Sequence, residues 1–390
     1  MASKKSVTAV ALLLWVPAAL AEVSATLSVT QGKDDNYRLT ERAEDRVDTT
    51  AAEFGLRWGW VGPTSRVQVQ AQTRHTQLHG SDFDDQTSHR VTARYDGESK
   101  TMSYGGAVTW QRRDLLQSTD FVDRGIGADP TLEQPDLDVT LVEDAVERDE
   151  ADLSAYVGFK LNRRTELQIA SNFRQVDYDR LGERFGLQGS DTVGVALRLK
   201  RDVSRQDEVA VRHAVAQFQP DVVGETRFTE SAVSWTRETS KRTKLHLEAG
   251  RWKADTQGFA AESGMLWRGI AEHKTSQWRA RLLLEQTTYP SGLGEPVEFQ
   301  RAAVWLNRAL GRKWDVEIIA QKNRARSPQG LTQNDRDYAE LNTAFRYALS
   351  RSTRLKLGHR YQHLNRKRRP GDAEGHGAFV TFEYTPRSRQ

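Results

Sequence analysis

The strongest constraint on the fold is a two-residue alternation of side chains near the C-terminus, between Tyr338 and Leu364. In the first arm, Leu341 and Phe345 fall on one face, and Glu340 and Arg346 fall on the other. Successive side chains of a strand point to opposite faces, so this period predicts a β-hairpin around a short polar turn. Each arm has roughly 10–12 residues, which is long for a soluble strand but enough to cross a bilayer at a tilt.

Short turns alternate with longer polar connections along the rest of the chain. The longer connections include Gly32–Thr49, Asp114–Glu150 and Ser327–Asp335. This alternation is typical of transmembrane barrels, which have short periplasmic turns and long extracellular loops. We therefore expect an all-β fold, a transmembrane antiparallel up-and-down β-barrel of about 18 strands that begins near Val23–Gln31. The short turns lie at Val61–Thr64, Asp96–Ser99, Asn162–Arg164, Arg201–Ser204, Glu238–Arg242, Lys274–Ser276, Leu310–Lys313 and Ser350–Ser352.

A soluble propeller or sandwich is the main alternative, because a propeller repeats roughly every 40 residues. A propeller would show four shorter strands and a shared motif in each repeat, whereas each repeat here has two long arms. The pattern therefore favours the barrel. The segments Phe259–His273 and Val297–Arg308 are ambiguous in phase, and we expect a β-bulge there.

The N-terminus reads as an export signal. Lys4 and Lys5 precede an apolar run from Val7 to Ala18, and Ala19–Ala21 fits a cleavage site before Glu22. A transmembrane anchor is the alternative, but the run is short and no stop-transfer charges follow it. We expect residues 1–21 to be a cleavable signal peptide and residues 22–390 to be one barrel domain. The expected location is a bacterial outer membrane.

Aromatic side chains gather beside the short turns, where the rings of a barrel meet the lipid headgroups. This placement predicts a periplasmic aromatic girdle, and ordinary strand preference for aromatic residues is the alternative. The predicted girdle consists of Trp60, Tyr95, Trp235, Trp278, Trp314 and Tyr347.

The phase opposite to the apolar residues predicts the barrel interior. Basic residues outnumber acidic ones there, and glutamines such as Gln68, Gln70 and Gln72 lie among them. One interpretation is a hydrated, net-positive passage, because a wide barrel cannot be filled by its own side chains. The other is that inward charges pair across strands. The predicted lumen-lining set is Arg57, Arg74, Arg90, Arg94, Arg174, Arg198, Arg212, Arg279, Arg281, Arg346, Lys356 and Arg360.

Two loop segments have extreme charge. The segment Asp114–Glu150 carries twelve acidic residues and only two basic ones. It is either a constriction drawn to the positive wall or a solvated acidic loop. The basic run Arg366, Lys367, Arg368 and Arg369 lies on a predicted extracellular loop. It either contacts lipopolysaccharide phosphates or is simply solvated.

Motifs for catalysis and metal binding are absent from the sequence. There is no G-x-S-x-G elbow, H-E-x-x-H pair or phosphate-binding loop. The acidic segment lacks calcium-loop spacing, and the absence of cysteine excludes disulfides and thiolate metal sites. His75 and His79 would lie about 13 Å apart on a strand, too far to hold one ion. We expect no enzyme, no cofactor, no metal and no nucleic-acid partner, with a membrane-embedded hydrolase as the remaining alternative.

Three segments carry a resemblance to a known family. They are Asp34–Leu39 (DDNYRL), Asp45–Asp48 (DRVD) and the final strand Phe379–Pro386 (FVTFEYTP). In these segments the chain resembles outer-membrane β-barrel proteins associated with exopolysaccharide biosynthesis and exosortase-type gene clusters. The resemblance implies a part in secreting or anchoring an extracellular polysaccharide.

The sequence as a whole predicts a porin-like pore that passes an anionic solute or a secreted acidic exopolysaccharide through a basic lumen. A non-conducting scaffold of a polysaccharide export complex is the alternative. The expected partners are outer-membrane lipid and lipopolysaccharide, the barrel-assembly machinery during biogenesis, acidic polysaccharide and periplasmic export components.

Overall fold

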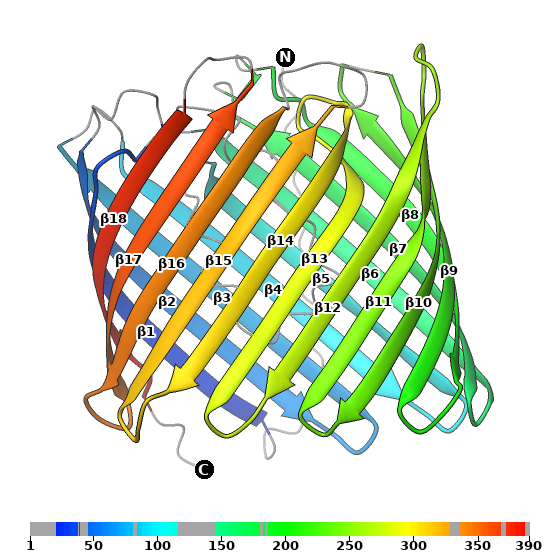
Figure 1. Ribbon diagram of the computed structural model, residues 1–390, viewed down its shortest axis with the longest axis horizontal. Coiled ribbons are helices and arrows are strands. Elements are labelled where there is room, and N and C mark those ends of the chain that lie inside the picture. Colours follow the sequence, from blue (N-terminus) through cyan, green and yellow to red (C-terminus); the bar gives the residue numbers. More distant parts are fainter. Residues whose placement is uncertain are drawn as a thin grey trace.

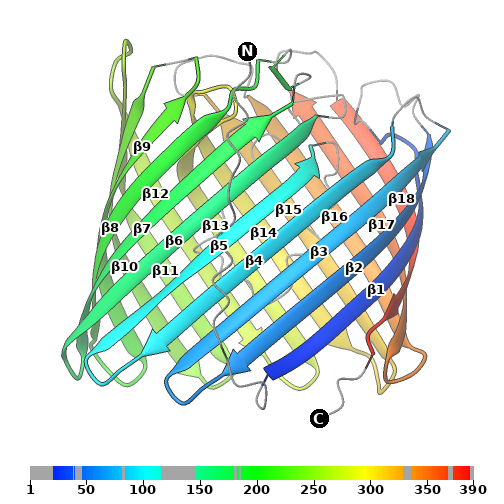
Figure 2. The same cartoon turned by 180° about the vertical axis from the view of Figure 1, so that it is seen from behind.

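The chain forms a closed antiparallel barrel of 18 strands, shown from opposite sides in Figure 1 and Figure 2. The strands are β1 (Ala21–Asp34), β2 (Val47–Val61), β3 (Ser65–His79), β4 (Gln86–Glu98), β5 (Met102–Asp114), β6 (Glu147–Asn162), β7 (Thr165–Tyr178), β8 (Ser190–Asp202), β9 (Asp207–Pro220), β10 (Thr226–Ser240), β11 (Thr243–Thr256), β12 (Glu262–Lys274), β13 (Trp278–Pro290), β14 (Pro296–Ala309), β15 (Trp314–Arg326), β16 (Arg336–Ala348), β17 (Thr353–Arg366) and β18 (Asp372–Tyr384). Each strand pairs with its neighbours in sequence, and β1 also pairs with β18 to close the sheet. The predicted fold is confirmed.

This computed structural model describes residues 21–37, 39, 46–80, 84–115, 146–179, 182–183, 186–222, 224–327, 335–367 and 372–386. The predicted signal peptide lies outside the described residues except for Ala21, which begins β1. The ends of the predicted acidic loop belong to strands, because β5 extends to Asp114 and β6 begins at Glu147. Residues 116–145 of that loop lie outside the described residues. Within the described ranges, no helix is long and apolar enough to span a membrane.

The hairpin predicted between Tyr338 and Leu364 is formed by β16 and β17. Tyr338 pairs with Leu364 at one end and Tyr347 with Leu355 at the other, around the turn at 349–352. The same two-residue alternation governs the other strands. On β8, Val193 is 53% exposed while its neighbour Gly194 is buried. An exposed apolar outer face alternating with an inner face is the arrangement of a transmembrane barrel.

The predicted girdle residues lie on the outward phase, toward the strand ends that the short turns connect. The rings of Trp314 on β15 and Tyr347 on β16 have centroids 4.5 Å apart. The guanidinium of Arg308 lies 4.3 Å from the centroid of the Trp278 ring. Rings that pack together and beside a cation are suited to a headgroup region, where one side is apolar and the other is wet.

The predicted bulge is wrong. Pairing is continuous along β12 and β14, and the register shifts lie instead between Lys160 and Asn162 and between Arg237 and Ser240. The phase was ambiguous because β12 and β14 have apolar side chains on both faces. Leu266 on β12 is buried on the inner face, beside the outward Trp267. The ambiguity therefore reflects an apolar lumen patch and not an irregular strand.

Candidate functional site: the barrel lumen

The alternation places the whole predicted lumen-lining set on the inward phase. On β17, for example, Leu355 and Leu357 point outward, so Lys356 and Arg360 point inward. The inward members are Arg57, Arg74, Arg90, Arg94, Arg174, Arg198, Arg212, Arg279, Arg281, Arg346, Lys356 and Arg360.

Most of these inward cations contact a carboxylate on the lumen wall. Arg174 lies 2.8 Å from Glu150, and Arg212 lies 2.8 Å from Glu230. Such pairs match the alternative in which inward charges neutralise one another across strands. The other inward pairs are Arg94–Asp96, Arg198–Glu208, Arg281–Glu272, Arg346–Glu317, Lys356–Glu317 and Arg360–Asp34.

The wall formed by β2, β3 and β4 differs from this pattern. We call six of its inward side chains the Arg/Gln wall: Arg57, Arg66, Gln68, Gln70, Gln72 and Arg90; the inward Arg74 and Arg94 are not part of it. Arg57, Arg66 and Arg90 are exposed, and none lies within 4.0 Å of a carboxylate among the described residues. The amide oxygen of Gln68 accepts hydrogen bonds from Arg57 Nε and Nη2, at 2.8 and 2.6 Å, when its amide is oriented to satisfy both groups.

The Arg/Gln wall also extends along the barrel axis. Arg66 is one residue from the short-turn end of its strand, Arg57 is four residues from it and Arg90 is eight. The register sets Arg57 beside Gln70 and Arg90 beside Gln72. The carboxylate of Glu53, on the same wall, accepts a 2.8 Å hydrogen bond from Gln72. Arg57, Gln68 and Gln72 are thus already hydrogen-bonded, whereas the exposed Arg90 guanidinium can bind an anion and the exposed Gln70 amide can bind hydroxyl groups.

A buried ionic row lies on the wall formed by β12, β13 and β14. Glu285 is only 1% exposed, accepts a 3.0 Å hydrogen bond from Arg268 Nε and lies 2.6 Å from Arg301 Nη2. Arg281, on the same face of β13, contacts Glu272 of β12 at 3.3 Å.

Part of the lumen wall is apolar. An inward apolar cluster lies on β9 to β12, and its largest members are Phe218, Phe228, Trp252 and Leu266. A second cluster contains Leu283 and packs against Trp305. Polar and apolar stretches therefore alternate around the wall, and the β2–β4 side is one of the polar stretches.

Loop residues contact one another at the end of the barrel where the long connections lie. The backbone N–H of Gln188, after β7, donates a 2.7 Å hydrogen bond to the carbonyl of Gly292, after β13. Leu187 is buried against Leu293 and Val146. These contacts join connections that follow strands far apart around the barrel.

The connection after β1 also packs inward. Leu39 is buried against Tyr338 and Leu364, both on the inward phase. The phenol of Tyr37 donates a 3.1 Å hydrogen bond to Gln86, and burial raises the pKa of this tyrosine well above its ordinary value. These contacts place Tyr37 and Leu39 against the inner wall at the long-loop end.

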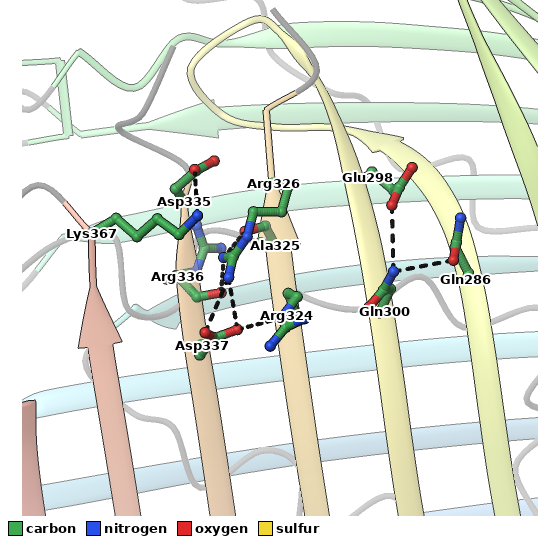
Figure 3. A network of polar contacts seen from close by, with 10 residues as sticks. All are labelled: Gln286, Glu298, Gln300, Arg324, Ala325, Arg326, Asp335, Arg336, Asp337 and Lys367. Atoms are coloured by element: carbon green, nitrogen blue, oxygen red, sulfur yellow. Dashed lines mark hydrogen bonds and ion pairs between the residues drawn. The ribbon is translucent and has the colours of Figure 1, made fainter. Parts of the chain in front are cut away.

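The basic run predicted to contact lipopolysaccharide is divided by the end of β17. Arg366 is the last residue of β17 and lies on the inward phase. Lys367 follows it, and its ammonium lies 3.7 Å from the carboxylate of Asp335 (Figure 3). Arg368 and Arg369 lie outside the described residues.

Sequence reasoning missed several inward cations, including Arg66, Arg268 and Arg301. Arg66 stands at the very start of β3, where alternation alone gives little indication of phase. Arg268 and Arg301 lie on the strands with apolar residues on both faces. Strand pairing brings Arg268 level with Glu285, and Glu285 level with Arg301, and no local sequence signal indicates this row. Across the described ranges, His, Cys, Asp and Glu side chains form no group of three that could hold a metal ion.

No protein-family model matches this chain, and no curated protein sequence matches it. Solved structures similar to it include the outer membrane protein OpdK of Pseudomonas aeruginosa, with 11% identity, a TM-score of 0.49 and coverage of 94% of this chain and 98% of that one. OpdO of the same organism has 12% identity and a TM-score of 0.48, over 94% of this chain and 97% of that one. OccAB4 of Acinetobacter baumannii has 10% identity and a TM-score of 0.48, over 94% and 98%. The barrel fold described above rests on the strand pairing of this chain itself.

Proposed function

We propose that this protein is a porin-like channel of a bacterial outer membrane that passes anionic solutes, with a secreted acidic polysaccharide as its preferred cargo. In the outer membrane, the short turns would face the periplasm and the long connections would face the outside of the cell. The apolar outer face and the aromatic girdle support a membrane-embedded barrel, and the apolar run at Val7–Ala18 supports export.

The Arg/Gln wall is the observation that carries this proposal. Its exposed arginines lie more than 4.0 Å from every carboxylate among the described residues, so their positive charge acts on the lumen. Charges that line a pore with low-dielectric walls concentrate ions of opposite sign. Arg57, Arg66 and Arg90 stand at successive heights, so they offer a series of weak sites along the axis.

Polymer cargo is favoured by the amides among these arginines. A guanidinium group binds a carboxylate with two parallel hydrogen bonds, and a glutamine amide can both donate to and accept from a sugar hydroxyl. Gln70 lies beside Arg57, and Gln72 lies beside Arg90. A chain of acidic sugars could therefore exchange one pair of contacts for the next, as the resemblance to exopolysaccharide-associated barrels also suggests.

Reversal potential in planar bilayers under a salt gradient tests the channel. We expect anion selectivity for the wild type and a shift toward cations for R57E/R90E, because these positions face the lumen. The control R227E/K322E makes the same change in net charge on the outward phase and should leave selectivity unchanged. Equal selectivity of R57E/R90E and the wild type would contradict the proposal.

The alternative function is a non-conducting scaffold of a polysaccharide export complex, and the contacts at the long-loop mouth favour it. The hydrogen bond between Gln188 and Gly292 joins two connections, and Leu187 is buried there. A scaffold would be electrically silent, yet its deletion would still reduce polymer at the cell surface. Bilayer conductance together with surface-polymer measurement on a deletion strain therefore separates the two functions.

The partners are part of the same proposal. Val380, Phe382 and Tyr384 are exposed on the outward phase of β18, as a closing strand read by the barrel-assembly machinery would require. Of the basic run Arg366–Arg369, the part after Arg366 is proposed to meet lipopolysaccharide, because Arg366 itself lies on the inward phase. Periplasmic export components would meet the short turns.

A further inference from the structure

The outer face of β10 and β11 carries a basic group at the long-loop end. We call Arg227, Arg251 and Lys253 the rim patch; all three are exposed and lie on the outward phase. On β11, Leu247 and Ala249 precede Arg251 on the same face. Arg251 is thus the first charged side chain beyond the apolar part of that strand.

Several other outward cations at this end of the barrel are neutralised within the protein. Arg112 donates two hydrogen bonds to Asp149, at 2.8 and 2.6 Å. Arg324 and Arg326 both contact Asp337, at 2.8 and 3.0 Å, as Figure 3 shows.

The rim patch has no comparable partner. Arg227 and Arg251 lie beyond 4.0 Å from every carboxylate among the described residues. Lys253 is 3.8 Å from Asp255, and both side chains are about 60% exposed, so this ion pair is weak.

The side chains around the rim patch indicate which kind of ligand it would bind. Arg251 pairs across the strands with Met265, which is 55% exposed, and Leu247 below it is 53% exposed. A ligand for this surface must combine apolar chains with anionic groups at their polar end. Basic residues beside a membrane surface attract phosphorylated headgroups, and arginine binds phosphate with two parallel hydrogen bonds.

We propose that the rim patch binds the phosphate groups of lipid A in the outer leaflet, with acyl chains lying on Leu247 and Met265. The inference rests on the proposed outer-membrane placement and is independent of conductance. It places the lipid on β10 and β11, on the outer wall of the barrel, and the Arg366–Arg369 run is not needed for it.

Native mass spectrometry of the folded barrel in detergent tests this site, with lipid A added at increasing concentration. A basic residue near a phosphorylated surface strengthens binding by about fivefold. We therefore expect R227Q/R251Q/K253Q to need at least about ten times more lipid A for half-saturation than the wild type. The control R112Q should change this value by less than about twofold, because its charge is already tied to Asp149.

Two further ligands identify the recognised group. Dephosphorylated lipid A should bind the wild type and the triple variant equally weakly, and millimolar inorganic phosphate should not displace lipid A. Equal lipid A binding by both proteins would overturn the proposal, as would tight binding of the dephosphorylated lipid or displacement by free phosphate. Heat-modifiable gel mobility checks folding, and R251Q alone replaces the triple variant if that variant does not fold. The triple variant should keep wild-type selectivity in bilayers, so failure of lipid binding and failure of the channel are separate results.

Discussion

The guanidinium of Arg360 on β17 lies 2.5 Å from the carboxylate of Asp34 at the end of β1, and the two residues are 326 positions apart. The strand between them is β18, and both residues pair with its Gly377. A Cβ atom at position 377 would lie 3.0 Å from the Asp34 carboxylate and 3.6 Å from Arg360 Nε. The ion pair therefore crosses the closing strand through the space left by a glycine, and it ties the two ends of the sheet together.

We expect loss of either partner of this pair to destabilise the barrel strongly. The Arg360 and Asp34 side chains are only 13% and 5% exposed, so D34N or R360M leaves one nearly buried charge without its partner. The free energy of unfolding should fall by roughly 3 kcal/mol, measured by urea titration of the folded barrel in detergent. The double variant D34L/R360M should lose less than the sum of the two single changes.

The pair between Lys33 and Asp48 is a matched control, because it also involves β1 but is exposed. Its side chains are 68% and 52% exposed, and the distance between them is 3.4 Å. K33M should cost less than about 1 kcal/mol. Equal losses for K33M and R360M would show that the Arg360–Asp34 pair does not stabilise the closing seam.

A second prediction concerns the buried row at Glu285. E285Q removes the charge that offsets both Arg268 and Arg301, so we expect a loss of roughly 3 kcal/mol in the free energy of unfolding. E383Q is the comparison, because Glu383 and its partner Arg354 are 35% and 59% exposed and lie 3.5 Å apart. It should cost less than about 1 kcal/mol. Urea titration of both variants checks the difference, and a larger loss for E383Q would contradict it.

Alternation was enough to predict the class of fold, the number of strands and the inward or outward phase of most of them. The reason is that lipid exposure imposes apolar side chains at every second position, as on β8 from Val193 to Leu199. On β12 and β14, however, alternation did not distinguish the inward face from the outward face. There Leu266 and Phe299 are apolar and inward, because clusters pack inside the lumen.

The sequence did not indicate which inward charged side chains contact one another in the lumen. Arg268, Glu285 and Arg301 form one row only because two separate strand registers bring them level. A shift of one residue in either register would send one of these side chains to the outer face. Contacts such as that between Gln188 and Gly292 depend on the curvature of the whole barrel, which no local pattern records.

A third prediction separates Arg279 from Arg281, which share a face of β13. Arg279 is exposed and has no carboxylate within 4.0 Å among the described residues. We expect R279E to shift the reversal potential in bilayers toward cations while the barrel stays folded. Arg281 is buried between Glu272 and the Trp305 ring, so R281E should destabilise the barrel by placing two carboxylates together. Unchanged selectivity in folded R279E would show that Arg279 does not act on the conducted ion.

The last prediction compares two inward glycines whose added Cβ atoms would meet different obstacles. At Gly250 on β11 the Cβ would collide with the Ser231 carbonyl oxygen and lie 2.7 Å from Ala232 Cα, so the backbone of β10 must move. At Gly358 its three nearest atoms would all belong to the Phe379 ring, and a ring can rotate away. G250A should therefore lower the free energy of unfolding by about 3 kcal/mol, and G358A by about 1 kcal/mol. G311A is the control, because nothing lies within 4 Å of its added Cβ. Urea titration of the three variants should give this order, and a G358A loss equal to that of G250A would mean that the Phe379 ring is as fixed as the backbone.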